Sequence, residues 1–202
     1  MTEPAPLPPL VIVLTGPSGV GKDVLINRLE EIGIPVERPA TMTTRAPRPG
    51  EEEGVHHYFV TREQFRQNVA ERQLLEHAEV YGNSYGVPRK SVRAALDTGR
   101  DVVIRVDIQG AKTLHGLLPS ALFICLTADG IDDLRARLLH RSTESTEDIE
   151  RRISIAKAEI EEAGKFCAMV VNREGCLDDT VDEILRLMDA ERGRSGRGTI
   201  ML

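Results

Sequence analysis

The sequence predicts an α/β protein in which helices cover both faces of a parallel sheet. Short apolar runs alternate with amphipathic stretches along most of the 202 residues, as they do in β-α units. A glycine-rich phosphate-binding motif lies between the first apolar run and the stretch after it. One long polar segment breaks the alternation and indicates an inserted subdomain. Together these observations predict a three-layer P-loop NTPase fold in a single domain.

The predicted strands and helices follow one another in pairs. Each strand is an apolar run, and each helix is the amphipathic stretch that follows it. The pairs are Leu10–Leu14 with Asp23–Ile32, Val102–Val106 with Gln109–Leu118, Leu122–Leu126 with Asp132–Leu139, and Met169–Val171 with Asp179–Met188. Because ligands of open parallel sheets bind at the carboxyl ends of the strands, we expect the functional residues at that edge.

Two segments depart from this alternation. Residues 41–87 mix proline, glycine, charge and short alternating stretches such as Leu75–Val80, which predicts a small α+β insertion with antiparallel strands. Residues 140–146 are polar and precede a long helix, with Ser145 and Asp148 spaced like a capping box. The expected layout is a core of residues 10–40, 88–138 and 149–192, the insertion 41–87, a helical lid 139–148 and a disordered tail 193–202.

The composition is that of an ordinary globular protein, with 41% hydrophobic and 29% charged residues. A net charge of −6 argues against general nucleic-acid binding, which uses net positive charge. Three widely spaced cysteines without a CxxC pair predict reduced thiols and no zinc site. The residues Met1–Pro4 contain no basic region, and Val11–Leu14 is too short to cross a bilayer. We therefore expect a cytoplasmic protein without membrane partners; the oligomeric state is left open.

The strongest chemical signal is the phosphate loop between the first strand and the first helix. Glycines let the backbone N–H groups converge on phosphate oxygens, the helix dipole adds positive potential, and the lysine reaches the β- and γ-phosphates. The alternative is a glycine-rich turn that binds nothing. The loop consists of Gly16, Pro17, Ser18, Gly19, Val20, Gly21 and Lys22, and it predicts ATP binding.

The residue after the lysine departs from the motif. A serine or threonine is expected there as a Mg²⁺ ligand, whereas this chain has Asp23. A carboxylate can hold Mg²⁺ directly or through water, although it also brings negative charge close to the phosphates. The sequence therefore predicts Mg²⁺ as cofactor and Asp23 as its protein ligand.

A second phosphate site is indicated by Arg45 and Arg48, which lie in the proline-stiffened run Thr41–Glu51. Two fixed guanidiniums can clamp a dianionic phosphate. Taken alone, such arginines are equally often solvated at the surface. The adjacent acidic residues Glu51–Glu53 are interpreted as a solvated loop.

Several motifs in the order found here resemble the guanylate kinase family, over a stretch from about Val11 to Arg192. They are the phosphate loop, the run Thr43–Glu51, Leu75–Glu79, Tyr81–Gly86, Val106–Gly110, the arginine-bearing lid and Val170–Asn172. The resemblance implies that Arg45, Arg48 and Tyr85 hold the GMP phosphate, that Thr41, Glu76 and Asp107 contact the guanine, and that Asn172, Arg137, Arg141 and Arg152 surround the triphosphate.

The chemistry of Glu76 supports a guanine site independently. A carboxylate accepts from the N1–H and N2–H donors of guanine, whereas adenine would present a lone pair to it. The alternative is a solvent-facing residue on a half-exposed strand. For the lid, guanidiniums would stabilise the charge of the transferring phosphoryl group. The alternative for Arg137 and Arg152 is that they face solvent.

Three positions differ from the family pattern. His57 stands where the family has a phosphate-binding tyrosine and Tyr58 is one residue late, so either residue is a candidate for the acceptor phosphate. If His57 is the contact, GMP should bind more tightly towards pH 6. Val87 replaces a base-contacting hydroxyl, and Arg105 replaces a carboxylate. Because Asp23 and Arg105 are both unexpected charges beside the phosphates, we expect Arg105 to pair with Asp23 or with an ATP phosphate.

The resemblance predicts the reaction ATP + GMP → ADP + GDP. One alternative is a kinase acting on a ribose bisphosphate, whose phosphate loop is similar and also has an aspartate after the lysine. A second alternative is a guanylate-kinase-like binding module without catalysis. Retention of Lys22 and of the full glycine spacing argues against the second alternative, and the paired guanine-facing carboxylates argue against the first.

Overall fold

Two sheets organise the chain, whose computed structural model describes residues 8–80, 82–141, 146–195, 198, 200 and 202. The larger sheet has five strands, all parallel, in the order β2-β7-β1-β8-β9. Its strands are β1 (Val11–Thr15), β2 (Val36–Glu37), β7 (Asp101–Arg105), β8 (Leu122–Thr127) and β9 (Ala168–Val171). The predicted parallel sheet is confirmed.

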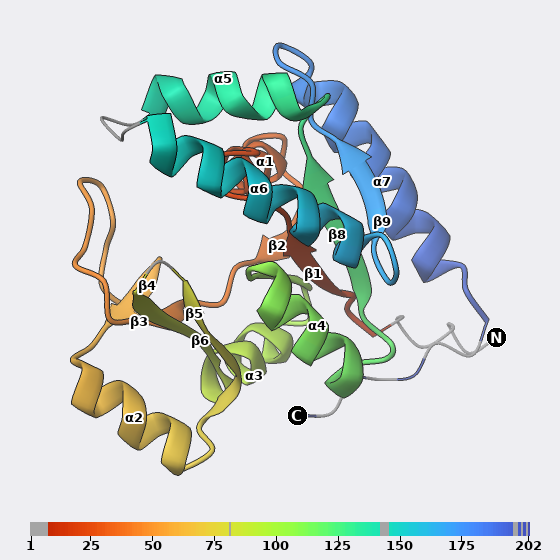
Figure 1. The fold of residues 1–202 in the computed structure, drawn as a ribbon. Coiled ribbons are helices and arrows are strands. Elements are labelled where there is room, and N and C mark those ends of the chain that lie inside the picture. Colours follow the sequence, from red (N-terminus) through yellow and green to blue (C-terminus); the bar gives the residue numbers. More distant parts are fainter. Residues whose placement is uncertain (1–7, 81, 142–145, 196–197, 199, 201) are drawn as a thin grey trace, which may run out of the picture.

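Helices cover both faces of this sheet (Figure 1). On β1, Ile12 and Leu14 belong to one buried cluster while Val11 and Val13 belong to the other, because successive strand side chains point to opposite faces. The first cluster is closed by α1 (Lys22–Glu31), α5 (Ile131–Arg141), α6 (Thr146–Ala163) and α7 (Leu177–Arg192), and the second by α3 (Arg89–Asp97) and α4 (Ile108–Leu117). The result is the three-layer arrangement expected from the sequence.

The smaller sheet lies at one side of the molecule, with α2 (Arg62–Ala70) beside it (Figure 1). Its four strands run in the order β4-β3-β6-β5. They are β3 (Thr41–Thr43), β4 (His57–Phe59), β5 (Leu74–Val80) and β6 (Asn83–Pro88). The β3–β6 and β5–β6 pairs are antiparallel as expected, whereas β3 and β4 pair in parallel. Helix α2 begins with a capping box between Thr61 and Gln64.

The predicted lid and tail are only partly described. The capping-box residues Ser145 and Asp148 lie outside the residues whose side chains are described. The composition predicted a disordered tail. In the structure, however, the apolar side chains of Ile200 and Leu202 pack against the α3–α4 face of the core. Both Nε and Nη2 of Arg93 donate to the Leu202 carbonyl, at 3.0 and 2.7 Å. None of the described helices is long and apolar enough to cross a membrane.

Candidate active site

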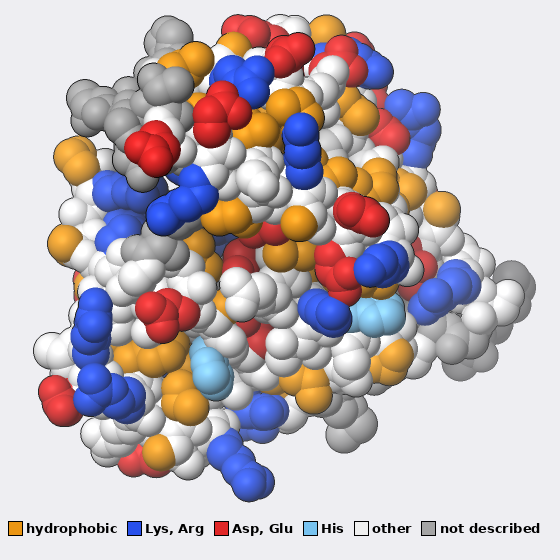
Figure 2. Space-filling model, viewed as in Figure 1, with side chains coloured by type: hydrophobic (Ala, Val, Ile, Leu, Met, Phe, Trp, Pro, Cys, Tyr) orange, Lys and Arg blue, Asp and Glu red, His pale blue; other side chains and the backbone are white. Residues whose placement is uncertain are grey.

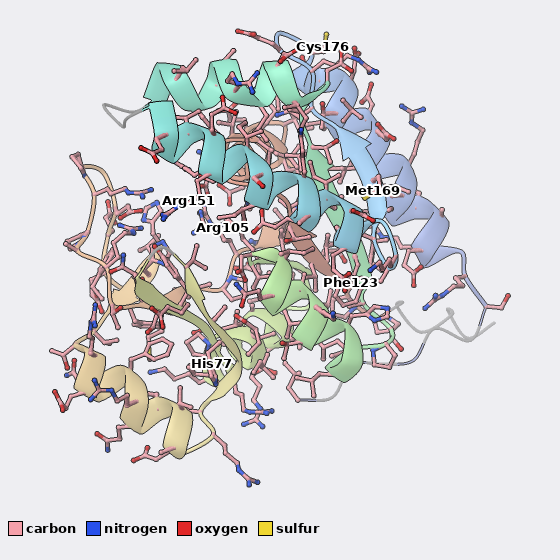
Figure 3. All side chains as sticks on the ribbon, in the orientation of Figure 1. His77, Arg105, Phe123, Arg151, Met169 and Cys176 are labelled. Atoms are coloured by element: carbon pink, nitrogen blue, oxygen red, sulfur yellow. The ribbon has the colours of Figure 1, made fainter. Side chains whose placement is uncertain are left out.

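A cavity of about 440 Å³ lies between the phosphate loop, the small sheet and α6. It opens at the carboxyl ends of β1 and β7, where the fold predicted the functional residues. Figure 2 shows lysine and arginine side chains gathered along the border where the small sheet faces α5 and α6. Figure 3 shows Arg105 and Arg151 in this region, between the small sheet and α6. The border is therefore suited to anionic groups.

The phosphate loop adopts the conformation that its glycines permit. Gly16 has φ +138°, and a Cβ at this position would lie 2.2 Å from the Leu126 carbonyl oxygen. Gly21, with φ +96°, begins α1 in the left-handed region, which favours glycine. Lys22 Nζ donates to the carbonyls of Gly16 and Pro17, at 2.5 and 3.0 Å, so its ammonium lies over the loop. The backbone is thus arranged to surround phosphate oxygens.

The ammonium of Lys22 is held in a buried and partly positive environment. Burial and the nearby Arg105 guanidinium lower the pKa of Lys22 to about 8. Glu159 on α6 also lines the cavity, and burial raises the pKa of its carboxyl. Glu159 could not be identified from the sequence, because its proximity to Lys22 depends on how α6 packs over the sheet.

The expected pairing of the two unusual charges is confirmed. Arg105 Nη1 donates to Asp23 Oδ1, and the same oxygen accepts from Arg38 Nη2 at 2.5 Å. Arg105 ends β7 next to β1, in register with Leu14, which brings it beside the start of α1. Burial alone would raise the pKa of Asp23, but Arg105, Arg38 and Lys22 together lower it. Arg38 was missed because its position depends on the chain path after β2.

His57 and Tyr58 lie on opposite sides of β4. His57 is 3% exposed and lines the cavity, whereas Tyr58 packs with the small-sheet core and carries Lys90 Nζ 5.0 Å from its ring centroid. Both ring nitrogens of His57 have partners: Nδ1 lies 2.7 Å from Thr41 Oγ1, and Nε2 lies 3.2 Å from Arg105 Nη2. In this arrangement both ring nitrogens of His57 are engaged and Tyr58 is not among the residues that line the cavity, which argues against the expected phosphate contact for each.

The pKa of His57 argues against the expected pH effect. Burial and the charges of Arg105 and Arg45 lower the pKa of His57 to about 4, so the imidazole stays neutral at pH 6. A neutral imidazole gains no attraction for phosphate as the pH falls towards 6. The expected pH effect requires a solvated histidine, whereas His57 is buried beside guanidiniums that lower its pKa.

The two candidate phosphate-clamping arginines have different surroundings. Arg45 makes a bidentate pair with Glu51, with both N–O distances 2.8 Å, and its Nε donates to the Tyr85 hydroxyl at 3.3 Å. Glu51 also accepts from the Arg48 backbone N–H, and these bonds lower the pKa of the Glu51 carboxyl to about 2. Arg48 is exposed and lines the cavity. Glu51 is therefore a positioning residue for Arg45, not the solvated loop residue that the sequence suggested.

The opposite end of the cavity is acidic, and its main acidic side chain is almost completely buried. Glu76 is 5% exposed, and its Oε2 accepts no hydrogen bond from the described residues. Burial, together with the charge of Asp107, raises the pKa of Glu76 to about 8. A Cβ on Gly110 would lie 2.6 Å from this oxygen, so glycine leaves the space that the carboxylate uses. An unsatisfied buried acceptor is costly and points to a ligand with N–H donors.

Three other residues expected near the base line the same cavity. Asp107 caps α4 by accepting from the Gly110 N–H at 2.9 Å, and burial raises its pKa. Thr41 is 8% exposed and bonded to His57. Val87 is fully buried in the cavity wall and offers no polar atom from its side chain. The base-contact residues implied by the family resemblance are therefore brought together with Glu76.

The lid arginines and Asn172 support the loop from outside the cavity. Arg137 Nη2 donates to the Asn172 carbonyl at 2.6 Å and its Nε to Asp133 at 2.9 Å. Asn172 Nδ2 donates to the Val20 carbonyl at 2.8 Å. Arg152 Nη2 donates to Ser18 Oγ at 2.7 Å. Neither arginine simply faces solvent. The Arg141 side chain is outside the described ones.

The described residues contain no group of three or more His, Cys, Asp or Glu side chains that could hold a metal by themselves. Both guanidinium bonds to Asp23 reach Oδ1, and no described residue bonds to Oδ2. Mg²⁺ in kinases is commonly bound by one or two carboxylates together with substrate phosphates and water. The donor set therefore fits a metal that arrives with a nucleotide.

Comparisons with known proteins indicate the family of this chain. The guanylate kinase family model matches residues 9–191. The chain is 42% identical over 98% of its length to guanylate kinase 2, chloroplastic/mitochondrial, of Oryza sativa subsp. japonica, covering 71% of that protein. It is 43% identical to a guanylate kinase of Lactobacillus delbrueckii subsp. bulgaricus, covering 90% of this chain and 89% of that protein. A guanylate kinase crystal structure from Anaplasma phagocytophilum has a TM-score of 0.75 at 30% identity, covering 95% of this chain and 90% of that one.

Proposed function

The chain belongs to the guanylate kinase family, and we propose the roles that its residues play in moving the γ-phosphoryl group of ATP to GMP. The reaction gives ADP and GDP. The observation that supports GMP most directly is the buried Glu76, whose Oε2 lacks a hydrogen-bond partner among the described residues, at the end of a cavity with a cationic border. Guanine N1–H and N2–H would satisfy this carboxylate, whereas adenine would leave it unsatisfied.

The acceptor is held at both ends. Glu76 and Asp107 bind the guanine, and Arg45, Arg48 and Tyr85 bind the GMP phosphate. Support comes from the pairing of Arg45 with Glu51, which fixes a guanidinium at the cavity wall before substrate arrives. Preorganised donors of this kind lose little freedom on binding.

The donor ATP lies along the phosphate loop, with the Lys22 ammonium directed at its β- and γ-phosphates. Lys22 now donates to loop carbonyls and would exchange them for phosphate oxygens. Guanylate kinases generally need a divalent metal, and we propose Mg²⁺ held by the ATP phosphates with Asp23 as its protein ligand. When bound, Mg²⁺ neutralises phosphate charge during transfer.

The remaining cations position the loop and shield the reaction. Arg137 joins α5 to the residues after β9, and Arg152 joins α6 to Ser18, so movement of α5 and α6 would be transmitted to the loop. We propose that residues 139–148 act as a lid and that Arg141 contributes a further positive charge. Closure would exclude water from the transferring group. The cytoplasmic location stays a prediction.

One coupled assay tests the function and its two alternatives. ADP release would be measured with MgATP and, in turn, GMP, dGMP, AMP, UMP and ribose 1,5-bisphosphate. We expect GMP to give the highest kcat/KM, with AMP lower by about 10⁴-fold because it leaves Glu76 unpaired. Preference for the ribose bisphosphate, or the absence of turnover with every acceptor, would contradict the proposal.

A further inference from the structure

A chain of polar contacts joins the two ends of the cavity. Arg105 Nη2 lies 3.2 Å from His57 Nε2, and His57 Nδ1 lies 2.7 Å from Thr41 Oγ1. The three residues come from β7, β4 and β3, and so the contacts bridge the two sheets. His57 is 3% exposed and Thr41 is 8% exposed, which protects these bonds from competing water.

The direction of each hydrogen bond follows from the chemistry of the guanidinium. Arg105 has only donors, so His57 Nε2 must accept. A neutral imidazole that accepts at Nε2 carries its proton on Nδ1, and it therefore donates to Thr41 Oγ1. Glu51 Oε1 is 3.8 Å from Nε2, beyond hydrogen-bonding distance, and is already bonded to Arg45.

Arg105 is itself held in place. Its Nη1 donates to Asp23, so the guanidinium has a fixed partner on the side away from His57. Rotation of the guanidinium to relieve the contact with His57 would break this ion pair. The tautomer of His57 is therefore determined by a residue that ends a strand of the other sheet.

The consequence lies at Thr41. A hydroxyl has one proton and two lone pairs. When His57 donates to one lone pair, the Thr41 proton remains available to the cavity that Thr41 and Glu76 both line. With the other imidazole tautomer, the hydroxyl would donate to Nδ1 and present only a lone pair to the cavity.

This polarity matters for the acceptor base. In guanine the 6-oxo oxygen, an acceptor, is next to the N1–H that Glu76 would bind, whereas adenine has an amino donor in its place. We propose that Arg105 and His57 act as positioning residues that fix the Thr41 hydroxyl as a donor to the 6-oxo group of the acceptor purine. The inference rests on the proposed GMP function.

The experiment measures binding and not turnover, with GMP and 6-thio-GMP as probes, by calorimetry without ATP or metal. The 6-thio analogue keeps N1–H and N2–H for Glu76 but has a much weaker acceptor at position 6. We expect the wild-type protein to prefer GMP by about 10-fold, and His57→Phe and Arg105→Met each to reduce this preference several-fold. Thr41→Val should reduce it similarly.

Two further variants separate positioning from structural damage. His57→Asn keeps an amide N–H near the place of Nδ1 and should recover part of the preference that His57→Phe loses. His77→Phe is the matched control, because His77 is an exposed residue of β5 whose ring stacks edge-on against Phe65, away from the cavity (Figure 3). It should leave both affinities unchanged.

Coupling between the residues decides the inference. If His57 acts through Thr41, the double variant His57→Phe, Thr41→Val should lose no more preference for GMP than the worse single variant. Additive losses, or equal losses for GMP and 6-thio-GMP in His57→Phe, would overturn the inference while leaving the guanylate kinase function intact. Failure of the wild-type protein to bind GMP would instead contradict the proposed function.

Discussion

The two ends of the cavity differ in whether their charged side chains have partners within the protein. At the phosphate end the lining cations Arg45 and Arg105 already have carboxylate partners, Glu51 and Asp23. Arg137, which supports the loop from outside the cavity, is likewise paired with Asp133. At the base end the buried carboxylate of Glu76 has an oxygen without a hydrogen bond from any described residue. The phosphate end is thus preassembled, whereas the carboxyl group at the base end lacks hydrogen-bond donors that a ligand could supply.

The difference shows where each end obtains its selectivity. Paired guanidiniums keep their geometry and remain charged at every physiological pH, so they suit phosphates of any nucleotide. A buried carboxyl whose pKa is raised to about 8 stays largely protonated until a ligand with suitable N–H groups stabilises its anion. Discrimination between bases is therefore expected at the acidic end, and changes there should spare the donor.

The largest effect should follow from Lys22→Met, which keeps the aliphatic stem and removes the ammonium over the loop. Loss of a cation directed at the transferring group should lower kcat by about 10²- to 10³-fold. Binding of GMP alone should be almost unchanged, since Lys22 lies on the donor side. Steady-state kinetics and calorimetry measure the two effects. A normal kcat for this variant would contradict a role of the phosphate loop and its Lys22 ammonium in phosphoryl transfer.

Glu76→Gln tests the acidic end with a side chain of the same shape. One amide N–H would then face the donors of guanine, so kcat/KM for GMP should fall by about 10-fold or more while the KM for ATP changes little. Kinetics with each substrate varied in turn would measure this. Equal losses for both substrates would indicate misfolding, and no loss for GMP would exclude Glu76 from the base site.

The parts of the fold and of the site that could be predicted from the sequence are those that depend on residues close together in the chain. The strand, loop and helix around Lys22 were predicted nearly to their ends, because glycine spacing and apolar runs act over a few neighbouring residues. The parallel sheet followed from alternation along the chain. Family resemblance then supplied the residues around Glu76 and Arg45 and their expected roles.

The features that were missed are contacts between distant strands. Either His57 or Tyr58 was expected to bind phosphate, yet the surroundings of His57 depend on β7 and β3 as well as on β4. No periodicity shows that Arg105 lies beside it and lowers its pKa. Glu51 was interpreted as solvated because acidic runs usually are, but the loop turns it back onto Arg45. By contrast, the Asp23–Arg105 pair was predicted because two unusual charges balanced each other.

The contrast between the ends also predicts a pH dependence for GMP binding. Below pH 8 the Glu76 carboxyl is mostly protonated in the protein without ligand, and guanine N–H donors need the anion. GMP affinity should therefore rise with pH between about 6.5 and 8, by at most about 10-fold per unit, with release of a proton. His57, whose pKa is about 4, stays neutral throughout this range. Calorimetry in buffers of different ionisation enthalpy would measure the proton.

Glu76→Gln is the control for this effect and should abolish both the pH dependence of GMP affinity and the proton release.

The Glu76 carboxyl also predicts how the stability of the folded protein depends on pH. Because the folded pKa of Glu76 is raised from 4.5 to about 8, wild-type stability should decrease as the pH rises through this window, whereas the variant should lack this decrease. Thermal melts of both proteins at pH 5 and pH 8 would test it. Tighter GMP binding at pH 6 than at pH 8 would contradict the proposal that the Glu76 anion binds the guanine N–H donors.

The smallest effect concerns the paired charges at the phosphate end. Asp23→Ser and Arg105→Asp should each raise the KM for MgATP, because the first leaves Arg105 without its carboxylate and the second replaces a guanidinium by a second carboxylate beside Asp23. The double variant places a hydroxyl after the lysine and a carboxylate on β7, which restores the arrangement typical of the family. It should recover part of the loss, with a coupling energy of about 1 kcal/mol, or about 5-fold in kcat/KM.

Arg38 also donates a hydrogen bond to Asp23 Oδ1 and would partly compensate for the single changes, which is why the expected coupling energy is modest. Repeating the cycle in an Arg38→Met background should therefore enlarge it. Strictly additive losses in both backgrounds would show that Asp23 and Arg105 affect nucleotide use independently of each other, and the preassembly of the phosphate end would then rest on the pairing of Arg45 with Glu51.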